Sequence, residues 1–152
     1  MAVQHLSGQE LSERVSAAAP DSVVTESAGV PVGDALWVHA PKVAEVASFL
    51  KSDDRLDFNF LNSISAVDYI DHFDVVYHLT SLSKQHTAIV KTRLNGREEL
   101  SLPSVYHLWR GADFQEREIW DLMGIRFEGH PNMKRIMLWE GFDGHPLRKD
   151  YL

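Results

Sequence analysis

The feature that most constrains the fold is the regular alternation of apolar and polar residues from Phe73 to Leu79. Side chains at every second position share one face of a strand, so this pattern predicts a half-buried strand over residues 73–82. Similar segments predict strands over 59–68 and 87–94, and Asn95-Gly96 is a turn signal that ends the last of them. Three strands with short connections favour a largely antiparallel or mixed sheet.

The residues before these strands predict two helices and two short strands. Ser7 and Glu10 have the spacing of a capping box, so a helix is expected to begin there. Strands are expected at 23–26 and 35–38, joined as a hairpin, and a second helix over 41–52. The order helix, two strands, helix, three strands predicts a two-layer α+β fold.

After Pro103 the sequence changes character. Asp113 is expected to cap a helix that ends at Gly124, and from Ile125 onward the Gly and Pro content is too high for regular elements. We therefore expect an α+β domain over residues 1–103, followed over 104–152 by a capped helix and an extended C-terminal docking tail.

Composition excludes several functional classes. The chain has no cysteine, so it has no disulfide, no thiolate-held iron-sulfur cluster and no cysteine nucleophile. Residues 1–90 hold 5 Lys/Arg against 12 Asp/Glu, and residues 91–152 hold 10 against 10. This acidic first part argues against nucleic-acid binding. No apolar run reaches the length of about 18 residues that spans a bilayer, and the start lacks the features of a signal peptide, so we expect a soluble chain.

Four charged residues, Glu116, Arg117, Glu118 and Asp121, crowd the helix after Gly111. Arg117 and Asp121 are four residues apart and could pair. One interpretation is a solvated, salt-bridged face. The other is that some of these charges are buried and need partners, because apolar residues leave little of the helix free.

Catalytic interpretations have little support. Eight histidines suggest a metal, with His130, His145 and Glu118 as the first trio to consider, but no ligand spacing typical of a metal site is present. Both His-Pro pairs follow a glycine, which favours turns in which the histidine bonds backbone. Neither a nucleophile motif nor a glycine-rich phosphate loop is present.

The order of motifs in the last quarter of the chain resembles the C-type subunit family of respiratory complex I, which is related to the J-type subunit of the cyanobacterial and plastid enzyme. The residues that carry the resemblance are Glu116-Arg117-Glu118, Asp121-Leu122, Gly124-Ile125, Phe127, Gly129-His130-Pro131, Arg135-Ile136 and Gly144-His145-Pro146-Leu147-Arg148-Lys149-Asp150-Tyr151.

The resemblance implies a non-catalytic hydrophilic subunit in the peripheral arm of a proton-pumping NADH-quinone oxidoreductase. It implies that this chain holds no cofactor, while the complex holds FMN, iron-sulfur clusters and quinone. The expected partners are the large quinone-site subunit, of the D type, and nearby cluster-bearing subunits, with no nucleic acid. Membrane association would come through the complex, at the cytoplasmic face of a bacterial cell membrane or, alternatively, at a thylakoid membrane.

The resemblance also implies an interface, and two other functions remain open. A related complex that uses ferredoxin, a reduced deazaflavin or formate could contain the same subunit, and a stand-alone metal hydrolase is the third hypothesis. We expect replacement of Arg148 or Asp121 by alanine to impair assembly more than folding. The expected interface residues are Glu116, Arg117, Glu118, Asp121, Gly129, His130, Pro131, Arg135, Gly144, His145, Pro146, Leu147, Arg148, Lys149, Asp150 and Tyr151.

Overall fold

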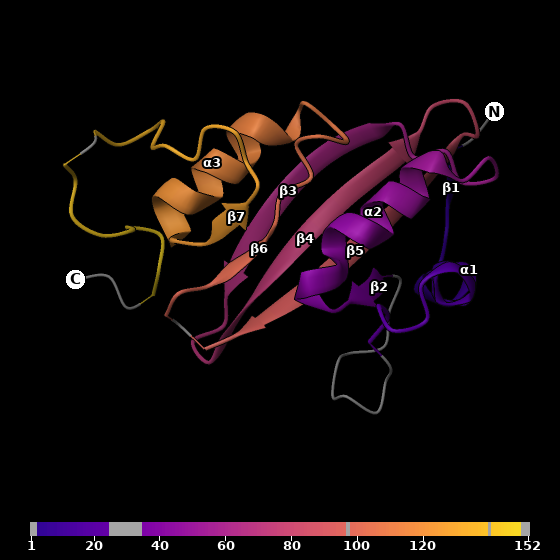
Figure 1. Ribbon diagram of the computed structural model, residues 1–152, viewed down its shortest axis with the longest axis horizontal. Coiled ribbons are helices and arrows are strands. Elements are labelled where there is room, and N and C mark those ends of the chain that lie inside the picture. Colours follow the sequence, from indigo (N-terminus) through magenta and orange to yellow (C-terminus); the bar gives the residue numbers. More distant parts are fainter. Residues whose placement is uncertain (1–2, 25–34, 97, 140, 150–152) are drawn as a thin grey trace.

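The computed structural model describes residues 3–24, 35–96, 98–139 and 141–149 (Figure 1). The elements follow the expected order with short additions at both ends of the fold. They are β1 (Gln4–His5), α1 (Gly8–Ala18), β2 (Ala35–Val38), the 3-10 turn η2 (Ala40–Lys42), α2 (Val43–Ser52), β3 (Phe60–Asp68), β4 (His72–Ser81), β5 (His86–Asn95), β6 (Ser101–Pro103), α3 (Ala112–Met123) and β7 (Arg126–Glu128).

Both expected N-terminal helices form. The Ser7 hydroxyl oxygen accepts the Glu10 backbone N–H at 3.2 Å, which caps α1 as its sequence predicts. Leu11 and Val15, four residues apart on one face, are completely buried. The apolar face of α2 is likewise buried, with Leu50 at its centre.

The large sheet is mixed. β3, β4 and β5 form the expected antiparallel meander, while β1 and β2 both pair with β5 in parallel. The predicted hairpin between 23–26 and 35–38 is wrong in its main pairing, because β2 bonds β5 and meets the earlier segment only through an isolated antiparallel bridge, Val23 to Val38. Residues 25 and 26 lie outside the described part.

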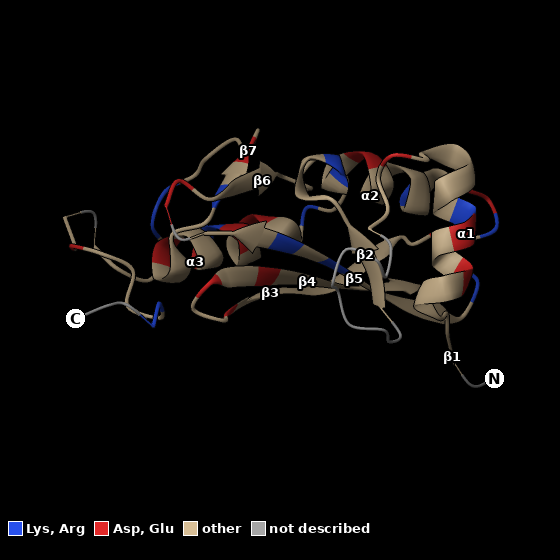
Figure 2. Ribbon diagram, turned by 90° about the horizontal axis from the view of Figure 1, so that it is seen from below, with Lys and Arg blue, Asp and Glu red and all other residues tan. Residues whose placement is uncertain are grey.

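The helices pack on one side of this sheet. Figure 2 shows α2 and α3 above β3, β4 and β5, with the β6–β7 pair above α3. Tyr77 and Leu79 on β4 and Val90 on β5 point toward α2, where they meet Ala47 and Trp109. The alternating pattern of β4 therefore directs its apolar side chains into the core, as predicted.

The signature region has more regular structure than the sequence suggests. β6 and β7 pair in parallel across α3, so a short strand lies at 126–128, where irregular structure was expected. The expected cap is also wrong: α3 begins at Ala112 after Gly111, with no side-chain capping bond. Gly124 ends the helix as predicted, with a φ of +79°.

Candidate partner-docking interface

Glu116 faces the core. It is fully buried, and its carboxylate accepts the Ser104 hydroxyl at 2.5 Å and the Val105 backbone N–H at 2.9 Å. Burial raises the pKa of Glu116 to about 7, although both hydrogen bonds lower it. The expectation that some charges of α3 are buried is confirmed, and Glu116 joins the helix to the segment after β6.

The Tyr77 side chain shares this buried region. Its hydroxyl has no hydrogen-bond partner among the described residues, and burial raises its pKa well above the ordinary value, with a further contribution from the charge of Glu116. The mutual effect shows that the carboxyl of α3 and the phenol of β4 lie close enough to interact in the interior. This pair belongs to the fold of the chain.

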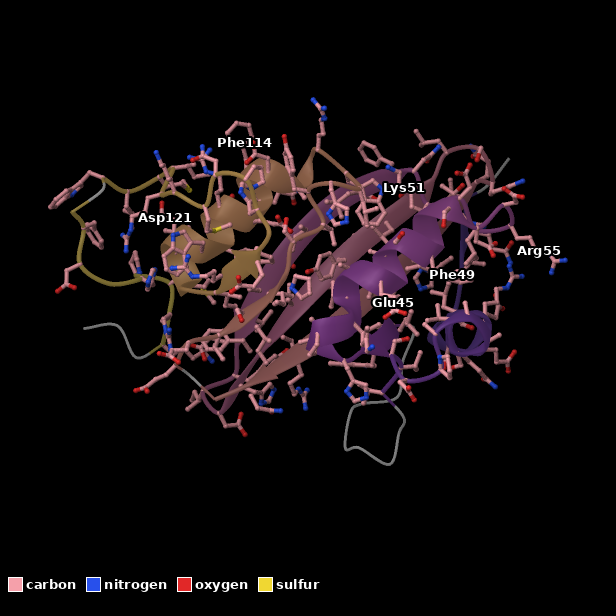
Figure 3. All side chains as sticks on the ribbon, viewed as in Figure 1. Glu45, Phe49, Lys51, Arg55, Phe114 and Asp121 are labelled. Carbon is pink, nitrogen blue, oxygen red and sulfur yellow. The ribbon has the colours of Figure 1, made fainter. Side chains whose placement is uncertain are left out.

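Asp121 is the anchor of the tail, which we define as residues 129–149. One carboxylate oxygen of this fully buried residue accepts three consecutive backbone N–H groups at 2.8–3.3 Å, from Ile136, Met137 and Leu138. The other oxygen lies 3.5 Å from a guanidinium nitrogen of Arg135. Figure 3 shows Asp121 on the side of α3 that faces the tail. The helix therefore determines the path of the tail.

Arg117 strengthens the same attachment. Its guanidinium donates to the backbone oxygens of Lys134 at 3.0 Å and Arg135 at 3.4 Å. The expected Arg117–Asp121 ion pair is therefore wrong, because each side chain bonds the tail instead. Arg135 in turn donates to the Gly144 carbonyl at 2.7 Å.

The two histidines that follow a glycine attach to opposite ends of α3. His130 Nε2 lies 3.0 Å from the Asp113 carboxylate in the first turn, and its Nδ1 accepts the Asn132 backbone N–H at 2.9 Å. Pro131 between them is exposed, and Gly129 before them has a φ of +85°. This histidine bonds nearby backbone, as the turn interpretation predicts.

His145 lies at the C-terminal end of α3. Its Nδ1 donates to the Asp121 backbone oxygen at 2.9 Å, and its ring packs against Trp120 with centroids 5.1 Å apart. A β-carbon at Gly124 would lie only 2.8 Å from Cδ2 of His145, so glycine is needed there for space as well as for its positive φ. Gly144 and Pro146 flank the histidine, with a φ of +88° at the glycine.

The last described residues continue along α3 toward the large sheet. Leu147 donates its backbone N–H to the Leu122 carbonyl at 2.9 Å, and Lys149 donates its own to the Asp68 carboxylate at 2.8 Å. The Arg148 guanidinium lies over the Phe73 ring, 5.2 Å from its centroid. Asp150 and Tyr151 lie outside the described residues.

The metal trio is not assembled. His130 and His145 lie at opposite ends of a 12-residue helix, and Glu118 is exposed. Within the described ranges, no group of three or more His, Cys, Asp or Glu could hold a metal ion. The side chains singled out in the sequence are organised for attachment of the tail.

Exposed apolar side chains beside this attachment are not marked by the sequence. Phe114 is 65% exposed, Met137 61%, Trp139 70% and Leu147 61%, of which only Leu147 was among the expected interface residues. No periodicity marks residues in a tail without regular structure, so the pattern of the sequence could not identify them. Figure 3 shows Phe114 at the start of α3, pointing away from the sheet. No helix among the described residues has both the length and the apolar character needed to cross a membrane.

Comparison with known proteins gives a consistent result. The family described as "Respiratory-chain NADH dehydrogenase, 30 Kd subunit" matches residues 36–152. The chain is 44% identical over 121 residues to the C 2 subunit of NADH-quinone oxidoreductase from Rhizobium etli, covering 78% of this chain and 64% of that protein. It is 40% identical over 141 residues to the C-type subunit of Roseiflexus sp., covering 91% and 80%. The chain thus spans slightly less than two thirds of the Rhizobium relative.

Two further similarities concern the context of such a domain. A Phocaeicola vulgatus protein, named as the C/D subunit of NADH-quinone oxidoreductase, is 40% identical over 121 residues, covering 79% of this chain and 23% of that protein. A chain in the solved structure of the membrane-bound sulfane sulfur reductase, an archaeal respiratory membrane complex, is 27% identical. It matches with a TM-score of 0.68 over 95% of this chain and 85% of that one.

Proposed function

The chain belongs to the family of the 30 kDa subunit of respiratory-chain NADH dehydrogenase, and from this membership we propose that it is a non-catalytic peripheral-arm subunit of an NADH-quinone oxidoreductase. Its role is structural. The complex holds FMN, iron-sulfur clusters and quinone, and this chain contributes no ligand to them. Association with a membrane comes through the complex, at the cytoplasmic face of a bacterial cell membrane, with a thylakoid membrane as the alternative.

The observation that carries this proposal is the ordered tail. Asp121, Arg117 and His145 bind it to α3, yet large apolar side chains beside them remain more than half exposed. Ordering a chain segment costs conformational entropy, and an exposed apolar patch is typical of an interface. A tail that is fixed in shape and apolar outside is suited to a partner protein.

We divide the expected interface residues into two groups by exposure. Glu116 and Asp121 are fully buried and shape the segment from within, together with the half-buried Arg117 and Arg135. Direct contact falls to residues that are exposed. Those are Glu118, Leu147 and Lys149, joined by Phe114, Met137 and Trp139.

The proposed main partner is the large quinone-site subunit of the D type. Support comes from the Phocaeicola vulgatus relative named as a C/D subunit, since that one chain carries both letters in its name. Cluster-bearing subunits are the proposed neighbours on the other side. On this basis residues 1–103 form the scaffold domain and 104–152 the docking segment, linked by the β6–β7 pairing.

The test is affinity purification from native membranes through a tag on the D-type subunit. We expect this chain in stoichiometric amounts with flavin- and cluster-bearing subunits, and loss of quinone reductase activity when its gene is deleted. Recovery of the chain alone, with activity unchanged by the deletion, would contradict the proposal.

A second candidate is the same structural role in a related complex with another electron donor. The specific observation is the similarity to a chain of the archaeal sulfane sulfur reductase. The purified complex distinguishes the two: electron transfer from NADH supports the first, while reduction only by ferredoxin, a reduced deazaflavin or formate supports the second.

A further inference from the structure

β3 is an edge strand of the large sheet. It bonds β4 on one side, and no described strand pairs with its other side. An edge strand presents backbone N–H and C=O groups to whatever lies beside it. The direction of each residue of β3 therefore decides what this edge can bind.

Two hydrogen bonds fix those directions. The Ile64 N–H points away from β4, because it donates to the side-chain oxygen of Gln115 on α3 at 2.6 Å. The Tyr69 N–H points toward β4, because it donates to the His72 carbonyl at 2.8 Å. Since directions alternate along a strand, both bonds place the N–H and C=O of Ala66 on the outer edge.

The outward groups of Ala66 face a groove between β3, α3 and the tail. The groove has a volume of about 220 Å³, and Ile119, Leu122 and Leu147 contribute to its walls. Glu118 is its one charged lining residue, and it has no ion-pair partner in the described part of the chain. No described residue bonds the outward N–H and C=O of Ala66.

Both ends of the open edge are closed by the chain itself. Gln115 occupies the Ile64 N–H, and the Lys149 N–H bonds the Asp68 side chain at the other end. The distance from residue 64 to residue 68 along a strand is about 13 Å, at roughly 3.3 Å per residue. A segment of three or four extended residues fits between these limits.

We propose that an extended segment of a partner subunit adds a short strand to the β3 edge at Ala66, with an apolar side chain in the groove and a Lys or Arg against Glu118. The proposal rests on the proposed function and names a contact within that assembly. Main-chain bonds to the edge supply affinity, while the groove and the carboxylate select the side chains.

A second copy of this chain is a poorer occupant. Pairing of two identical edges about a two-fold axis would place the same groove on both sides of the contact. The two Glu118 carboxylates would then lie in one interface without a basic residue from either groove. A basic partner segment satisfies the lone carboxylate, and a self-association does not.

Hydrogen exchange in the assembled complex tests the backbone bond. We expect the Ala66 amide to exchange at least about tenfold more slowly in the purified complex than in the isolated full chain, as one protected hydrogen bond requires. Equal exchange rates in the two samples would overturn the proposal. Slow exchange in the isolated chain that appears only at dimerising concentrations would assign the edge to a second copy, and would also overturn it.

Charge reversal tests the side-chain contact. Glu118→Lys is expected to lower recovery of the chain with the tagged D-type subunit by about tenfold, because a basic residue would then face a basic residue. Glu13→Lys makes the same charge change on an exposed residue of α1 and should leave recovery unchanged. Equal recovery of both variants would count against the contact.

A backbone variant completes the set. Ala66→Pro removes the outward N–H and no bond to β4, and proline is tolerated on edge strands. We expect it to fold and to assemble poorly, and normal assembly of a folded variant would refute the edge pairing. Failure of the unmodified chain to copurify would instead refute the proposed function, so the two failures are distinguishable.

Discussion

The Asp121 carboxylate and the Arg135 guanidinium face one another at 3.5 Å, with the acid fully buried and both residues in the same chain. Loss of one member of a buried pair leaves the other charge without compensation. The pair therefore links α3 to the tail before any partner is present. Replacement of Asp121 by alanine is now expected to affect the isolated chain as well as its assembly.

Asp121→Asn should release the tail from α3. The variant loses the charge that three backbone N–H groups share, so we expect amide exchange of Met137 and Leu138 to accelerate by about tenfold or more. The free energy of unfolding should fall by about 1–3 kcal/mol. Asp143→Asn, at an exposed aspartate of the same tail, is the matched control and should change neither quantity. Unaltered exchange in Asp121→Asn would contradict this role.

Gly124→Ala should destabilise the chain through two separable effects. The left-handed conformation costs a side chain about 1–2 kcal/mol, and the added β-carbon would also displace the His145 ring. Gly96→Ala isolates the first effect, because Gly96 has a φ of +88° with no atom within 4 Å of an added β-carbon. Urea unfolding should show a larger loss for Gly124→Ala, and equal losses would remove the packing argument.

Glu116 should make stability depend on pH. Its folded pKa of about 7 lies above the ordinary value of 4.5, so its contribution to stability is fully present below pH 4.5 and is lost as pH rises through 7. The expected loss is about 3 kcal/mol, from roughly 1.4 kcal/mol for each unit of pKa. Denaturant titrations between pH 5 and 8 would measure this slope. Glu116→Gln should flatten it and the exposed Glu118→Gln should not; a slope that persists in Glu116→Gln would assign it to another group.

Trp139→Ala should separate assembly from folding. The indole is 70% exposed, so the free energy of unfolding of the isolated chain should change by no more than about 0.5 kcal/mol. If Trp139 is an anchor of the interface, the affinity for the partner should fall by about 2 kcal/mol, or roughly 30-fold. Phe60→Ala, at the opposite end of β3 from the tail contact, is the control. Equal copurification of both variants with the D-type subunit would argue against Trp139 as a contact.

The sequence predicted most of the α+β domain because its signals are local. The alternation along β4 and the cap at Ser7 both depend on residues within a few positions, and both were confirmed. The partner of β2 depends on β5, about 50 residues away, and no local pattern encodes that parallel register. The error in the hairpin follows from this difference.

The candidate site shows the same division. Burial of Glu116 and Asp121 could be inferred from the apolar residues around them, but their ligands could not. Asp113 was expected to cap α3, and it instead binds His130, which is 17 positions later. A carboxylate at a helix start serves equally well as a cap or as a partner for a distant donor, and only the tertiary fold decides between them.

The attachment of the tail also determines the order in which this region can fold. Nearly all its bonds go to α3, at separations of 15 to 25 residues, so the segment closes by short loops once the helix exists. The tail follows α3 in the chain and leaves the ribosome after it. The helix can thus act as a template during synthesis, and only the bond from Lys149 to Asp68 must wait for a distant strand.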